Sequence, residues 1–237
     1  MRLRIVTHVE HRELRGHLPD LWPEFMQHDA AVSAFWPQLY EVYPDFQLWL
    51  LDGRQLIGCA CTLPVVWDGV AQPDGLDWVV TAGPNGMPTT LCGVVAALVP
   101  EYRGRGISAV VIGRMTKLAA AHGLDSLIAP VRPTWKERYP LTPIDHYSQW
   151  RREEDGYLYD PWLRTHERLG AELLAPAPRS MTITGSRDEW EQWTELQFPE
   201  DGDYIVPGAL APVSFADGAG TYVEPNVWMR HPVEPVY

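Results

Sequence analysis

The feature that most constrains the fold of this chain is an apolar run followed at once by two glycines and a helix. Residues 90–99 are nearly all apolar, which is typical of a central strand buried on both faces. Gly104 and Gly106 follow, and residues 107–122 carry apolar side chains at helical spacing. Residues 126–131 form the next apolar run, so the order of elements predicts a βαβ unit. The buried stripe of the helix is predicted to consist of Val110, Val111, Met115, Leu118 and Ala119.

The composition excludes several classes of protein. With 237 residues, of which 46% are hydrophobic, the chain can bury a full core, and its length favours one domain over two. No apolar stretch approaches the roughly 20 residues that span a bilayer, and the N-terminus lacks the apolar segment of a secretion signal. The net charge of -12 is opposite in sign to a nucleic-acid-binding surface. We therefore expect binding to neither membranes nor nucleic acids.

The cysteines indicate the compartment. Cys59, Cys61 and Cys92 lie in apolar, strand-like runs, and their number is odd. No set of histidines and cysteines has the spacing of a zinc site. We expect buried free thiols in a reducing compartment, the cytoplasm, and no bound metal.

The rest of the chain shows no repeat and no clean linker, so we expect one α/β domain. Residues 1–184 are predicted to form its main part, with an aromatic insertion over 133–159, and residues 185–237 an extension packed on it. Further strands are predicted over 3–6, 46–51, 55–63 and 172–184, and β-rich structure over 204–228. Helices are predicted over 160–170, with Asp160 as the N-cap, and over 188–196. Two helical stretches are expected within residues 11–43, with breaks at Pro19, Pro23 and Pro37.

The glycine-rich turn is also a candidate binding site. Glycines at a strand-to-helix junction let the backbone N–H groups between positions 103 and 108 converge, and the helix N-terminus adds about half a positive charge. Arg103 and Arg105 supply side-chain charge, so a diphosphate fits. No lysine follows as in a Walker loop, and Ala109 stands where a dinucleotide fingerprint has its third glycine. The other interpretation of these residues is a turn with two solvated arginines.

The segment V-P-E-Y-R-G-R-G-I-S, which ends at Ser108, resembles motif A of the GCN5-related N-acetyltransferases (GNATs), with the signature [Q/R]-x-x-G-x-[G/A]. Arg103 and Gly106 match, whereas Ser108 replaces the usual glycine or alanine. The resemblance is strongest over 90–131. It implies a GNAT-like α/β acyltransferase fold with a mixed, mostly antiparallel sheet, acetyl-CoA or another acyl-CoA as co-substrate, and direct transfer in a ternary complex. It also implies acyl-CoA contacts at Leu98, Val99, Arg103, Gly104, Arg105, Gly106, Ile107 and Ser108.

The catalytic residues of the family are only partly matched. Acyl transfer needs aligned reactants, a proton acceptor for the amine and a donor for the leaving thiolate. Many GNATs place a glutamate on the central strand, but residues 90–99 contain no acidic residue. Many also use the tyrosine of a Y-x-x-x-G pattern, and here His166 stands in that position before Gly170. The resemblance therefore implies that His166 donates a proton or polarises the thioester, whereas helical periodicity alone favours a packed core histidine.

The aromatic insertion and the helix after it are similar to the GNAT-like loading domains of polyketide synthases. That likeness aligns Thr134 and His166 with the essential threonine and histidine of those domains. It implies an alternative function, malonyl-CoA decarboxylation with S-acetyl transfer to an acyl carrier protein. A non-catalytic acyl-CoA-binding protein is the third possibility. The expected acceptor is a small molecule or a carrier protein, and the sequence gives no signal for the oligomeric state. Glu224 and Asn226 of the extension are further candidates to reach the site, with no role assigned to them.

Overall fold

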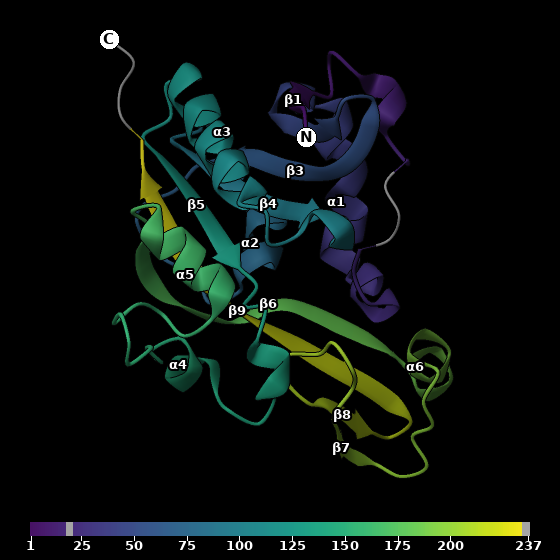
Figure 1. Cartoon of the computed structure of the whole chain (residues 1–237). Coiled ribbons are helices and arrows are strands. Elements are labelled where there is room, and N and C mark those ends of the chain that lie inside the picture. Colours follow the sequence, from purple (N-terminus) through teal and green to yellow (C-terminus); the bar gives the residue numbers. More distant parts are fainter. Residues whose placement is uncertain (18–20, 234–237) are drawn as a thin grey trace.

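The computed structural model describes residues 1–17 and 21–233, so the predicted break at Pro19 lies outside the described residues. A nine-stranded sheet forms the centre, with the strand order β1-β2-β3-β4-β5-β9-β8-β7 and β6 paired with β9 (Figure 1). The strands are β1 (Leu3–Thr7), β2 (Gln47–Asp52), β3 (Gln55–Val65), β4 (Thr90–Leu98), β5 (Ser126–Val131), β6 (Glu172–Ser186), β7 (Gly202–Tyr204), β8 (Val213–Ala216) and β9 (Ala219–Pro232). The α-helices are α1 (Ala30–Glu41), α2 (Gly75–Thr81), α3 (Ile107–Ala121), α4 (Ile144–Tyr147), α5 (Pro161–Arg168) and α6 (Arg187–Thr194). Single 3-10 turns are η1 (Arg12–Leu14), η2 (Glu24–His28), η3 (Pro44–Phe46), η4 (Pro100–Tyr102) and η5 (Lys136–Arg138).

The predicted βαβ unit is present as β4, α3 and β5. β4 and β5 are the one parallel pair among the described strands, and every other described pair is antiparallel. The prediction of a mixed, mostly antiparallel sheet flanked by helices is therefore confirmed. Within α3, however, Val110 is 51% exposed, while Ile107 and Ile112 are buried. The predicted stripe was wrong at Val110 because, at 3.6 residues per turn, that position lies outside the face shared by Ile107, Val111 and Met115.

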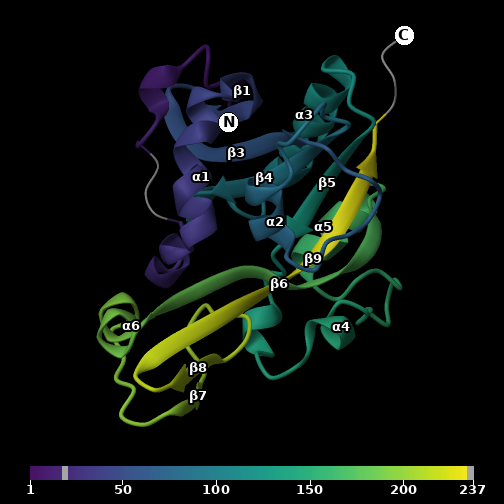
Figure 2. The same ribbon diagram turned by 180° about the vertical axis from the view of Figure 1, so that it is seen from behind.

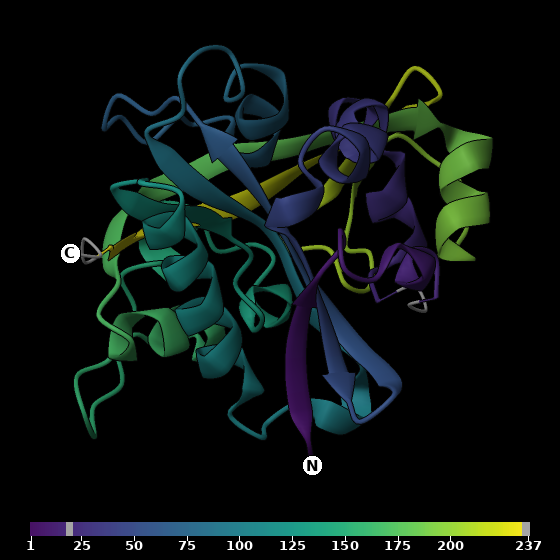
Figure 3. The same ribbon diagram turned by 90° about the horizontal axis from the view of Figure 1, so that it is seen from above.

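Helices cover both faces of the sheet (Figures 2 and 3). α1 and α2 pack on one face, where Phe35 and Val79 join a core cluster with Cys59, Cys61 and Cys92. α3 packs on the opposite face, and α5 contacts α3 on that side. All three cysteines are free and buried, as expected. None of the helices in the described part is both long and apolar enough to cross a membrane.

The predicted helix break at Pro37 was wrong. α1 runs through this residue, and its N-terminus is capped by Asp29, whose carboxylate accepts from the Val32 amide at 2.8 Å. A proline inside a helix loses one backbone hydrogen bond, but α1 buries Leu39 completely and Phe35 almost completely on the sheet. Burial of this apolar face outweighs the local loss.

β9 joins the two ends of the sheet. Its second half pairs with β5 from Val227 to Pro232, its first half pairs with β8, and β6 runs along its other edge. The helix α6 covers the far part, where Trp190 is fully buried and donates from Nε1 to the Gly220 carbonyl at 3.0 Å. The proposed boundary at residue 184 falls within β6.

Candidate active site

The parallel pair β4 and β5 separates after two residues. Their pairing is confined to Leu91 with Leu127 and Cys92 with Ile128. Beyond it, β4 continues along β3 and β5 continues along β9, and Pro130 has no N–H to offer to β4. The prediction that residues 90–99 are buried on both faces therefore holds only up to Cys92, and the rest of the strand is mostly half-buried. Among the described strands, none pairs with the backbone groups that face the gap.

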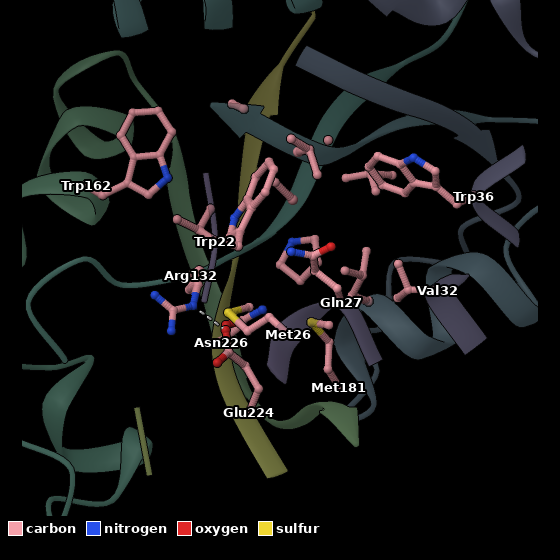
Figure 4. A pocket seen from close by; sticks show the side chains of 18 of the residues that line it. Trp22, Met26, Gln27, Val32, Trp36, Arg132, Trp162, Met181, Glu224 and Asn226 are labelled. Atoms are coloured by element: carbon pink, nitrogen blue, oxygen red, sulfur yellow. Dashed lines mark hydrogen bonds and ion pairs between the residues drawn. The ribbon is translucent and has the colours of Figure 1, made fainter. Parts of the chain in front are cut away.

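A cavity of about 460 Å³ occupies this gap (Figure 4), within the usual size range of small-molecule sites. The strands contribute residues 93–96 and 129–131 to its wall. On the side of α3 and α5 it is lined by Met115, Trp162 and His166, and on the side of α1 and α2 by Val32, Trp36 and Leu76. The cavity thus passes through the gap in the sheet and is lined from both layers of helices.

The glycine-rich turn follows β4 and the short 3-10 turn η4. Gly104 and Gly106 adopt left-handed conformations with φ of 73° and 74°, and Gly106 is the N-cap of α3. Within the described part of the chain, the amide N–H groups of residues 104–108 have no hydrogen-bond acceptor. Residues 103–106 are exposed, and the Arg103 Nε donates to the Leu98 carbonyl at 3.1 Å. An accessible group of free donors therefore stands at a helix N-terminus, which is the arrangement that binds phosphates.

His166 lies on α5 and lines the cavity. It is 3% exposed, and its Nδ1 lies 2.9 Å from the Nε2 of His231 on β9. Burial, and to a lesser degree His231, lowers the pKa of His166 to about 3, and burial lowers the pKa of His231 to about 4. Both imidazoles are therefore neutral at physiological pH, and the bond between them uses one proton. The Nε2 of His166 has no partner among the described residues.

Sequence reasoning did not find His231. The predicted β-rich segment stopped at residue 228, whereas β9 continues to Pro232. In an extended strand Val227, Met229 and His231 point to the same face, and the first two pack in the cluster that contains Leu163 of α5. Extending the alternating pattern by three residues would have placed a histidine opposite this helix.

The second predicted catalytic residue lies apart from the cavity. Thr134 is exposed on the turn after β5 and is not one of the lining residues. By contrast, Arg132, Glu224 and Asn226 all contribute to the cavity wall (Figure 4). Arg132 Nε donates to Glu224 Oε1 at 2.6 Å, so the end of β5 is tied to β9.

Comparison with known proteins places the fold. No family model matches the sequence. The loading GNATL domain of CurA from Lyngbya majuscula superposes with a TM-score of 0.64 and 16% identity, covering 98% of this chain and 97% of that one. The GphF GNAT-like decarboxylase in complex with isobutyryl-CoA superposes with a TM-score of 0.57 and 14% identity, and the match covers 99% of this chain and 100% of that one. This chain has the GNAT fold. The sequence resemblance to GNATs is confirmed.

A curated relative bears on the GNAT activity. The arginine N-acetyltransferase avaD of Aspergillus versicolor is 29% identical over 252 residues, which cover 91% of this chain and 87% of the relative. Together with the GNAT fold, this likeness confirms the expectation of an acyl-CoA-dependent acyltransferase. It does not favour the decarboxylase or the non-catalytic alternative.

Proposed function

We propose that this protein transfers the acetyl group of acetyl-CoA to an amine of a small molecule, with arginine as the first candidate. The observation that carries the proposal is that three features adjoin one another. These are the free amides of residues 104–108, the separated strands β4 and β5, and the cavity between the two strands. The arginine N-acetyltransferase relative supports the choice of acceptor. The buried free thiols fit a reducing compartment, so we place the reaction in the cytoplasm.

The co-substrate is proposed to lie along the edge of β4 that faces the gap. The diphosphate would accept from the amides of Gly104 to Ser108, with Arg103 and Arg105 supplying positive charge. The pantetheine arm would run past Leu98, the last residue of β4, and Val99. Beyond Cys92, β4 pairs with no described strand on the side of β5. The thioester then reaches the fork, by which we mean the point where β4 and β5 separate after Cys92 and Ile128. There the cavity extends to the other face of the sheet.

The chemistry is a direct transfer. The lone pair of the amine attacks the thioester carbon, an N–C bond forms, the C–S bond breaks, and the proton released from the amine passes to water. Alignment of the two reactants in one cavity supplies much of the rate. His166 lines the cavity, and its Nε2, which has no partner among the described residues, is the ring atom left to hydrogen-bond the reacting groups. Thr134 has no part in this proposal because it lies outside the cavity wall.

The test is incubation of the purified protein with acetyl-CoA and L-arginine or a panel of other amines. Free CoA is followed with a thiol reagent and the product by mass spectrometry, and a product heavier by one acetyl group supports the proposal. The variant His166→Ala should lose this activity, whereas His122→Ala, at an exposed histidine after α3, should keep it. Binding of acetyl-CoA without transfer to any amine would favour the non-catalytic alternative, and conversion of malonyl-CoA to acetyl-CoA would favour the decarboxylase.

A further inference from the structure

The cavity has a polar floor on the side of α1 and α2. Arg132 follows the end of β5, and Glu224 and Asn226 stand two residues apart on β9, so both side chains point to one face. Figure 4 shows these three side chains grouped below the tryptophans of the cavity wall. The proposed function uses none of them, although all three line the cavity.

Arg132 is the group that can take an anion. Its Nε donates to Glu224 Oε1 at 2.6 Å and its Nη2 to the Gly208 carbonyl at 2.5 Å, while its Nη1 has no acceptor among the described residues. Glu224 is completely buried, and its other oxygen accepts from Tyr222 at 2.5 Å. The side chain of Arg132 remains 26% exposed and contributes to the cavity wall.

A second cation lies near this floor. Lys136 is buried beside the cluster and donates to the carbonyls of Tyr139 and Leu210. Arg132 and Lys136 lie on either side of the buried carboxylate of Glu224, and of these two cations only Arg132 lines the cavity. A guanidinium N–H forms a strong, charge-assisted hydrogen bond to a carboxylate, and the free Nη1 of Arg132 can supply it.

Asn226 offers the complementary group. It is 3% exposed, its Nδ2 donates to Ser180 Oγ at 2.8 Å, and its Oδ1 has no donor among the described residues. A buried amide oxygen without a donor is unfavourable, and a ligand N–H would satisfy it once the amide turns toward the cavity. A carboxylate site and an N–H acceptor that lie side by side match the α-carboxylate and the α-amine of an amino acid.

We propose that the floor of the cavity binds the α-carboxylate of an amino-acid acceptor on Arg132 and an N–H of its α-amine on Asn226 Oδ1. The α-amine then lies next to the fork of β4 and β5, where the thioester ends, and the acceptor side chain extends between Trp22 and Trp36. Aromatic walls accept apolar side chains and also stack on a guanidinium. This inference rests on the proposed function and narrows it to acceptors that carry a free α-carboxylate.

The experiment compares each amino acid with the amine that lacks only its carboxylate: L-arginine with agmatine, L-lysine with cadaverine, and L-tryptophan with tryptamine. We measure kcat/KM with acetyl-CoA, and binding to the protein–CoA complex by calorimetry. The preferred amino acid should exceed its amine partner by roughly 10- to 100-fold, as expected for a charge-assisted hydrogen bond. Equal use of the two, or a preference for the amines, overturns the inference but leaves the acetyltransferase proposal intact.

A charge variant provides the internal control. Asn226→Asp keeps an acceptor oxygen but adds a negative charge beside the carboxylate site, so the ratio of L-arginine to agmatine activity should fall by about tenfold or more. Asn85→Asp makes the same replacement at an exposed position and should leave the ratio unchanged. The melting temperature and the CoA affinity of both variants must match the parent protein. If no amine is acetylated, the proposed function fails, and the binding arm still decides: failure of all three amino acids to bind better than their amines overturns the carboxylate site.

Discussion

Substitutions at Gly106 test how much the negative charge of the diphosphate contributes to the binding of the co-substrate. Gly106 has a φ of 74°, and apart from its chain neighbours no described residue has an atom within 4 Å of the position that a Cβ would take. A side chain there therefore projects into solvent, since Gly106 is exposed. Asp and Asn have the same shape and are the residues that best tolerate this left-handed conformation, so both variants carry the same backbone strain. They differ in one negative charge next to the proposed diphosphate site.

The size of the effect follows from Coulomb's law. Two unit charges about 4 Å apart repel by about 1 kcal/mol in bulk water and by about 4 kcal/mol at an effective dielectric constant of about 20. Because about 1.4 kcal/mol corresponds to a tenfold change in affinity, Gly106→Asp should bind CoA roughly 5- to 1000-fold more weakly than Gly106→Asn. At about 1 M salt the Debye length shrinks to about 3 Å, and the difference should become much smaller.

The assay is isothermal titration calorimetry with CoA at low and high salt. Pantetheine, which lacks the diphosphate, should bind both variants equally. Gly123→Asp is the matched control, since Gly123 has a φ of 68° and open space around it at the opposite end of the same helix. Equal CoA affinities for Gly106→Asp and Gly106→Asn at low salt would refute the diphosphate site.

Three further outcomes are expected. His166→Ala should lower kcat by about 10²- to 10⁴-fold with CoA affinity within about twofold, and His166→Tyr, which introduces the residue common in GNATs, should recover part of the rate in steady-state assays. Because the pKa values of His166 and His231 are lowered, to about 3 and about 4, the unfolded chain binds protons below pH about 6.5 that the folded protein does not. The free energy of unfolding should therefore fall as pH drops from about 6.5 toward 4, by up to about 1.4 kcal/mol per pH unit for each histidine, and urea titrations of a His166→Phe/His231→Leu variant should show a flatter profile. Trp190→Ala empties a fully buried site and should cost about 3–5 kcal/mol, seen in calorimetry as a melting temperature lower by roughly 6–20 °C.

The local pattern of this sequence predicts most of its elements because their signals are short-ranged. The apolar run before Gly104, the helical spacing after Gly106 and the Asp160 cap of α5 each act within a few residues, and the structure has all three elements. Asp160 Oδ1 accepts from the amides of Trp162 and Leu163, as an N-cap does. Where the sequence carries such local signals, they also predict where the helix or strand begins and ends.

The site was less predictable because it depends on contacts between distant residues. The fork of β4 and β5 arises from competition between strand partners, which the apolar run itself does not reveal. His231 meets His166 across 65 positions, and Arg132 meets Glu224 across 92. No local pattern encodes these contacts. The sequence therefore identified His166, Glu224 and Asn226 as residues that could reach the site, but not their partners His231 and Arg132.

The position of β9 has a consequence for the biosynthesis of this protein. Residues 227–232 occupy the slot beside β5, so the middle of the sheet stays open until the last strand of the described chain has been made. Long-range pairing of this kind slows folding and leaves apolar edges exposed in the nascent protein. A chain that stops before β9 would lack both His231 and the partner of Arg132, and a ribosome-bound intermediate would accordingly be an open, aggregation-prone sheet without a working centre.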